Sequence, residues 1–119
     1  MKLVIVAFLA LVPVAAQAAD QDPPCSDQVS TVDIVACVDK DTRLWDKRLN
    51  AAYKALGSFV DPAQREPLKL AQRSWVQYRD ANAAFYAAHE GTIGRILAAQ
   101  CLWTMTRDRT LELEQAARP

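Results

Sequence analysis

Along most of the chain, apolar residues recur at intervals of three and four, the period of an α-helix that buries one face. One such run begins near Thr42 and is ended by Gly57 and Ser58. Its apolar positions are Trp45, Leu49, Ala52, Tyr53 and Leu56. The part of the chain after residue 18 shows neither strand-like alternation nor a hairpin dipeptide. These patterns predict an all-α fold.

A second helix is predicted to begin at Asp61 and Pro62, because these residue types suit a helix N-cap and its first turn. The pattern continues to about His89, and Pro67 predicts a kink or a late start. The apolar stripe of this helix is predicted to contain Leu68, Ala71, Trp75, Tyr78, Asn82, Phe85 and His89. Such a regular stripe suits packing along a neighbouring helix at a shallow angle.

Two further helices are predicted at the ends of this region. After breaks at Gly91 and Gly94, a last helix is expected from about Arg95 to Ala116. Ser30, followed three residues later by an aspartate, resembles a capping box and predicts a short helix from about Thr31 to Cys37. The expected architecture is a small bundle of three main helices with a short N-terminal helix ahead of them.

The first 18 residues have the pattern of a secretory signal peptide. Lys2 supplies a positive charge, an apolar stretch follows, and Ala16-Gln17-Ala18 matches an A-x-A cleavage site. The apolar stretch is shorter than the roughly 20 residues that a spanning helix needs, although an uncleaved anchor is the alternative. Cleavage after Ala18 is predicted to leave one exported domain, residues 19–119. It is expected to be periplasmic or secreted, with no membrane attachment.

Charge and cysteine content narrow the class further. The chain has 14 Lys and Arg against 14 Asp and Glu, whereas nucleic-acid-binding and polybasic membrane-surface proteins carry a basic excess. Both classes are therefore excluded. A domain of about 100 residues often needs a covalent staple. Cys25, Cys37 and Cys101 all lie in the part predicted to be exported, where one disulfide with three possible pairings is expected.

Catalytic and metal-binding patterns are lacking in the sequence. His89 is the one histidine, and a partly buried or helix-capping role is its simplest interpretation. Cys, His and acidic residues show no spacing typical of a metal site. Gly91 and Gly94 stand apart rather than in a phosphate-binding loop. We therefore predict no enzymatic activity, no metal and no cofactor.

The stretch from Gln72 to Asp80 combines two large aromatic residues with charges that return every turn. On a structural interpretation Trp75 and Tyr78 belong to the core, and Arg79 reaches a carboxylate such as Asp46 on the preceding helix. On a functional interpretation the same residues contact a partner, since Trp, Tyr and Arg dominate binding hot spots. Trp75 is expected in the core, and both interpretations stay open for Arg79.

Three groups of residues occur in the order found in one family of bacterial domains. They are Cys37, Asp46, Leu49, Asn50 and Tyr53 as C…D..LN..Y; Gln72, Trp75, Tyr78, Arg79 and Asp80 as Q-x-x-W-x-x-Y-R-D; and Gly91, Cys101, Thr106 and Arg109 as a closing segment. This ordered set resembles the LprI-like lysozyme-inhibitor domain over nearly all of the chain after the signal peptide. The resemblance implies a small, helical, disulfide-stapled protein of the bacterial envelope.

The resemblance also bears on the disulfide. Family members commonly have a further cysteine where this chain has Ala83, which implies a Cys25–Cys37 bridge with Cys101 left free. A Cys25–Cys101 bridge is the alternative. Twelve residues of continuous helix span about 18 Å, whereas bridged Cα atoms lie at most about 7 Å apart. The first pairing therefore requires the chain to bend between its two cysteines.

The implied function is binding to a lysozyme and blocking its peptidoglycan-hydrolase activity. Hydrolytic lysozymes use two carboxyl groups in a saccharide cleft, and the Glu90–Gly94 turn with nearby cations is expected to approach it. The candidate contacts are Arg79, Glu90 and Arg95. A neutral inhibitor gains less electrostatic steering toward a cationic lysozyme than an acidic one does. The alternatives are a non-catalytic periplasmic module that binds another envelope protein or cell-wall fragment, and a redox role for the odd cysteine.

Overall fold

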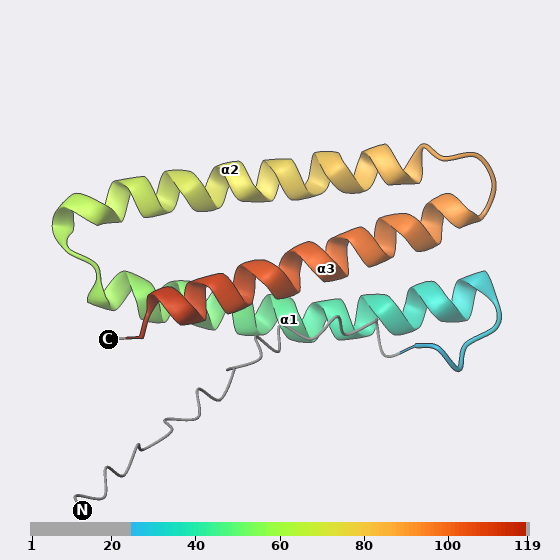
Figure 1. Ribbon diagram of the computed structural model, residues 1–119, viewed down its shortest axis with the longest axis horizontal. Helices are drawn as coiled ribbons and strands as arrows, with labels where there is room; N and C mark the ends of the chain where they lie inside the picture. The colour runs from blue at the N-terminus through green and yellow to red at the C-terminus, as the bar shows by residue number, and fades with distance from the viewer. Residues whose placement is uncertain (1–24, 119) are drawn as a thin grey trace, which may run out of the picture.

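The computed structural model describes residues 25–118, which form three long helices joined by short turns (Figure 1). The helices are α1 (Thr31–Phe59), α2 (Pro62–Ala87) and α3 (Ile93–Ala116). α1 and α3 pack closely along their length, and α2 packs along α3. The predicted all-α fold with three main helices is confirmed for these residues. The predicted signal peptide lies outside them.

α1 is one continuous helix of 29 residues, so the prediction of a separate short helix is wrong. Ser30 caps it as expected, because its hydroxyl accepts a hydrogen bond from the Asp33 amide at 3.1 Å. The helix continues past Cys37 because residues 38–41 contain neither glycine nor proline. The Thr42 hydroxyl donates to the Val38 carbonyl at 2.8 Å within the continuous helix.

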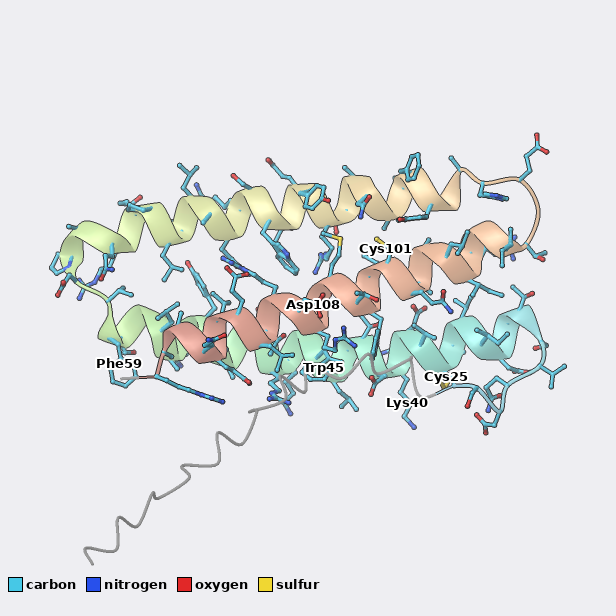
Figure 2. All side chains as sticks on the ribbon, in the orientation of Figure 1. Cys25, Lys40, Trp45, Phe59, Cys101 and Asp108 are labelled. Atoms are coloured by element: carbon cyan, nitrogen blue, oxygen red, sulfur yellow. A yellow bond between two sulfur atoms is a disulfide. The ribbon has the colours of Figure 1, made fainter. Side chains whose placement is uncertain are left out.

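The disulfide joins Cys25 to Cys37, and Cys101 is a free thiol. The two bridged Cα atoms lie 6.0 Å apart. A turn closed by the Gln28 amide on the Cys25 carbonyl, at 3.2 Å, reverses the chain before α1. Cys25 therefore lies beside the early turns of α1 (Figure 2). Both the predicted pairing and the predicted bend are confirmed.

The core follows the seam between α1 and α3 in two clusters. The first contains Cys25, Val38, Ala99 and Trp103, so the disulfide is part of the packed interior. The second contains Leu49, Ala52, Leu56 and Leu113. The side chains of Thr106 and Thr110 are also fully buried in α3. The Thr110 hydroxyl donates to the Thr106 carbonyl at 2.7 Å, whereas the Thr106 hydroxyl has no hydrogen-bond partner.

α2 begins at Pro62, so Pro67 does not delay its start. Its N-terminus is closed by the Asp61 amide, which donates to the Gln64 side chain at 3.0 Å. α2 ends at Ala87, slightly before the predicted His89, and α3 begins at Ile93 rather than Arg95. Differences of this size are common at helix ends.

The face that α2 turns toward α3 differs from the predicted stripe. Leu68, Trp75 and Asn82 are partly buried as expected, but Ala71, Tyr78, Phe85 and His89 are exposed. The less exposed positions of α2 are instead Leu68, Gln72, Trp75, Val76, Arg79, Asn82 and Ala83. The interpretation that placed Tyr78 in the core is therefore wrong. Polar residues occupy much of this narrow contact face, and hydrophobic periodicity assigns such residues to solvent.

Candidate functional site

Arg79 links α2 to α1 near the middle of the molecule. Its guanidinium lies over the Trp75 ring, 5.1 Å from the centroid. Its Nη2 lies 2.9 Å from the Asp80 carboxylate, and its Nη1 lies 3.8 Å from the Asp46 carboxylate. The predicted contact between Arg79 and Asp46 is thus present. The side chain of Arg79 is only 20% exposed, which favours the structural interpretation for this residue.

Arg109 links α3 to α2, as Arg79 links α2 to α1. Its Nε donates to the Gln72 side-chain oxygen at 3.0 Å, and its Nη1 lies 2.8 Å from the Glu112 carboxylate. Arg109 is 11% exposed. Two residues of the family motif that are far apart in sequence therefore meet directly. Their hydrogen bond and the Arg79 cluster hold α2 against the other two helices.

The remaining motif residues divide between the interior and the surface. Leu49 and Thr106 are fully buried, and Tyr53 packs against the second core cluster. Asn50 and Tyr78 are exposed, the latter by 63%. Most of the motif therefore specifies how the three helices fit together. It does not converge on one surface.

A pairing of arginine with tryptophan recurs on all three helices and was not predicted. The guanidinium groups of Arg48, Arg79 and Arg107 lie 4.8, 5.1 and 4.6 Å from the ring centroids of Trp45, Trp75 and Trp103, respectively. Each arginine follows its tryptophan by three or four residues, which places both on one helix face. This spacing is visible in the sequence, so the contacts were predictable from it.

Two polar contacts strengthen the α1–α3 seam. The Trp103 indole N–H donates to the Asp41 carboxylate at 2.5 Å. Arg48 forms a two-point ion pair with Glu114, through contacts of 2.5 and 2.7 Å. The hydrogen bond from Arg48 lowers the pKa of Glu114 from its ordinary value, and the same bond raises the pKa of Arg48. These contacts are structural and leave little free chemistry on the seam.

The turn between α2 and α3 lies at one end of the bundle (Figure 1), and its polar side chains are exposed. Gly91 has a φ of 77°, which favours glycine. A Cβ at Gly94 would lie 2.7 Å from the His89 carbonyl oxygen, so only glycine fits there without movement. Glu90 and Arg95 are exposed, and His89 is also exposed rather than buried. The two glycines therefore determine the backbone conformation of this turn, and its side chains are accessible to a partner.

The three predicted partner contacts do not form one surface. Arg79 precedes the end of α2 by eight residues, which corresponds to about 12 Å along the helix axis. Its guanidinium is also engaged by two carboxylates. Glu90 and Arg95 lie at the α2–α3 end, so they are the two candidates that the structure leaves accessible.

Cys101 lies on the side of α3 that faces α2 (Figure 2). It borders a groove of about 300 Å³ between these helices. The Asn82 amide donates to its sulfur at 3.4 Å, and the Met105 sulfur lies 3.7 Å away. Burial raises the pKa of the Cys101 thiol. A thiol held in its protonated form is a poor nucleophile, which argues against the redox alternative.

Residues 25–118 contain neither a membrane-spanning helix nor a cluster of metal ligands. In that range, no helix combines the length and the apolar character needed to cross a membrane. Cys, His, Asp and Glu also do not gather there in groups of three or more that could hold a metal ion. The described part of the chain is thus a disulfide-stapled helical domain whose accessible chemistry lies on its surface.

Comparison with known proteins assigns the domain to a family. A family model described as "Lysozyme inhibitor LprI" matches residues 24–113. The chain therefore belongs to the LprI lysozyme inhibitor family, as its motifs predicted. It is also 32% identical over 115 residues to an uncharacterized protein of Rhizobium meliloti (strain 1021), covering 84% of this chain and 83% of that protein. No solved structure matches the chain significantly.

Proposed function

We propose that this protein is a periplasmic or secreted inhibitor that binds a lysozyme and blocks its peptidoglycan-hydrolase activity. Membership of the lysozyme inhibitor family is the observation that carries the proposal. The Cys25–Cys37 disulfide supports export, because disulfides persist in oxidising compartments. The predicted signal peptide, cleaved after Ala18, supplies the route of export.

The α2–α3 turn is the contact region that we propose for the lysozyme. It is narrow and exposed, and the close packing of Gly94 against backbone carbonyls fixes its shape. Arg95 offers a cation to the two catalytic carboxyl groups of a lysozyme cleft, and charge-assisted hydrogen bonds to carboxylates are strong. Glu90 offers an acceptor on the same projection. A rigid projection loses little conformational entropy on binding.

Lysis of a cell-wall suspension by a c-type lysozyme tests this proposal. The purified protein is expected to slow lysis in a dose-dependent way, and Arg95→Glu is expected to weaken inhibition at least about tenfold, since it reverses a charge that faces carboxylates. Arg65→Glu is the matched control, because Arg65 is an exposed cation at the opposite end of α2. Equal inhibition by both variants would remove the turn from the interface.

A second function is favoured by one observation. The formal net charge of the chain is zero, so long-range steering toward a cationic lysozyme is weak. This favours the alternative of a non-catalytic module that binds another envelope protein or a cell-wall fragment. Unchanged lysis at large molar excess of the protein, with retained binding to isolated cell-wall material, would support that alternative over inhibition.

A further inference from the structure

α2 carries an exposed stripe that neither the fold nor the proposed inhibition uses. Its residues are Ala63, Leu70, Ser74, Tyr78, Ala81 and Phe85, all exposed. They are separated by seven, four, four, three and four positions, and therefore share one side of the helix. At 3.6 residues per turn, the charged residues of α2 project from other sides of the helix. We call these six residues the α2 stripe.

The size of the α2 stripe suits a protein interface. Leu70, Tyr78 and Phe85 are 65%, 63% and 72% exposed. Since a large aromatic side chain buries about 150–250 Å² when covered, the three together present on the order of 400 Å² of largely apolar surface. A standard interface buries about 800 Å² per partner, of which somewhat more than half is apolar. The three side chains therefore approach the roughly 450 Å² of apolar surface that such an interface buries on each partner.

We propose that the α2 stripe joins two copies of this chain as an antiparallel homodimer. Two pairs of stripe residues are placed symmetrically about Ser74, which is therefore the position expected on the two-fold axis. Leu70 and Tyr78 are equally far from Ser74, and so are Ala63 and Phe85. In an antiparallel pair, Leu70 of one copy therefore lies opposite Tyr78 of the other, and Phe85 lies opposite Ala63. Large residues meet smaller ones, as a self-complementary two-fold contact requires.

The surface beside Ala63 provides a place for the opposing aromatic ring. A groove of about 460 Å³ opens there between the end of α1 and the start of α2, lined by Leu56, Phe59 and Ala63 among others. Phe59 is itself 75% exposed at this end of the bundle (Figure 2). Phe85 of the opposing copy reaches this apolar groove in the antiparallel register. Each copy offers one groove and one ring, so the contact is made twice.

The apolar residues, and not the flanking charges, favour the antiparallel arrangement. In the antiparallel register Lys69 lies level with Arg79 of the other copy, and the two copies of Arg73 lie about 3 Å apart along the helix axis. A parallel pair brings Lys69 and Arg73 level with their own copies as well. The parallel pair also sets Tyr78 level with Tyr78 and Phe85 level with Phe85, so that large side chains meet large ones. The lysozyme cleft is a poorer occupant, because a charge-free stripe does not complement its carboxyl groups.

Sedimentation equilibrium of the exported, disulfide-containing protein, from micromolar to millimolar concentration, tests the dimer. The protein is expected to show a reversible monomer–dimer equilibrium. Tyr78→Lys is expected to weaken it at least about tenfold, because it places an unpaired ammonium group in an apolar contact. Leu44→Lys is the matched control, since Leu44 is an exposed leucine on α1. It should leave the equilibrium unchanged, and circular dichroism checks that both variants keep their helices.

Cysteine cross-linking tests the orientation, in a Cys101→Ser background so that the introduced thiol is the one free to react. Ser74→Cys is expected to form a disulfide-linked dimer under mild oxidation, because the position meets itself on the two-fold axis. Ala81→Cys is the control. Two copies of Ala81 lie about 21 Å apart along the antiparallel contact, beyond the roughly 7 Å that a bridge allows. Cross-linking of both variants would indicate a parallel pair and overturn the arrangement.

Three results would overturn the proposal itself. They are a monomer at all concentrations, a dimer that Tyr78→Lys does not weaken, and a monomer whose affinity for lysozyme falls with Tyr78→Lys. The last result would assign the α2 stripe to lysozyme instead. The dimer assay contains no lysozyme, so loss of the proposed inhibitory function leaves its outcome unchanged.

Discussion

Removing the disulfide through Cys25→Ala and Cys37→Ala together should lower the free energy of unfolding by about 3 kcal/mol. The cysteines are 12 residues apart, and closing a loop of this size in the unfolded chain corresponds to about 3 kcal/mol of lost entropy. Cys25 is also buried, with 6% exposure, in the first core cluster. Loss of its contacts adds to the entropic effect and does not oppose it.

The helices should survive this change. The disulfide closes a loop that contains only the turn before α1 and the first residues of α1 up to Cys37. Most of α1 and all of α2 and α3 lie outside the loop. Helix content is therefore expected to stay nearly constant at low temperature, while the melting temperature falls by roughly 12–24 °C, since 1 kcal/mol corresponds to about 4–8 °C in a domain of 60–100 residues.

Thermal unfolding followed by far-ultraviolet circular dichroism measures both quantities. Cys101→Ser is the control, because it removes the free thiol and leaves the bridge intact. Its melting temperature should fall far less than that of the double variant. A double variant that melts within about 3 °C of the parent would refute the reasoning, since this corresponds to less than 1 kcal/mol. Loss of helix content at low temperature would contradict the expectation that the three helices form without the disulfide.

Four further changes have defined outcomes. Gly94→Ala should lower stability by about 1–3 kcal/mol in chemical denaturation, because its Cβ would lie 2.7 Å from a backbone carbonyl oxygen. Thr106→Val should raise the free energy of unfolding by about 1 kcal/mol, since the Thr106 hydroxyl is buried without a partner. Thr110→Val should lower stability by a similar amount, because it removes a 2.7 Å hydrogen bond. Because the hydrogen bond from Arg48 holds the folded-state pKa of Glu114 below its ordinary value, this pair stabilises the fold above that ordinary value, and the contribution is lost as the pH falls through the folded-state pKa. Glu114→Gln should therefore make the acid-induced loss of stability shallower, and an unchanged acid profile would show that the ion pair contributes nothing.

Local signals in the sequence predict most of the fold, because each acts over a few residues. Ser30 and the Asp61-Pro62 pair mark two helix starts that the structure contains. Gly91 marks the turn before α3, and Gly94 is the second residue of α3. The continuity of α1 was missed because its first turns carry a capping signal of their own and the clear apolar run starts only near Thr42. Because neither glycine nor proline lies between Ser30 and Thr42, one helix runs through both signals.

Hydrophobicity alone could not predict which face of α2 packs against the other helices. Gln72 and Arg79 face the other helices because partners on those helices satisfy them, and those partners are distant in sequence. Tyr78 and Phe85 face solvent because α2 has a packing partner on one side only. Periodicity ranks residues by their polarity and does not report partners. It therefore selected a row of α2 adjacent to the one that is buried.

The candidate site was predicted in part, and for a different reason. The ordered motifs identified the family, and the family model confirms that assignment. The structure then shows that most motif residues serve packing, so the motif does not indicate where a partner binds. Glu90 and Arg95 remain the proposed contacts because they are exposed at the end of the bundle where α2 is joined to α3. Exposed partner-binding residues do not contribute to the hydrophobic periodicity of the sequence, so a binding measurement is needed to assign them.

Titration of the purified, disulfide-bonded protein into a c-type lysozyme, with cell-wall lysis followed by turbidity, tests the central claim most directly. We predict that lysis slows in proportion to the protein added and reaches its limit near one inhibitor per lysozyme. Protein that has been reduced and unfolded should have no effect. Undiminished lysis at large molar excess of the folded protein would contradict inhibition of this class of lysozyme.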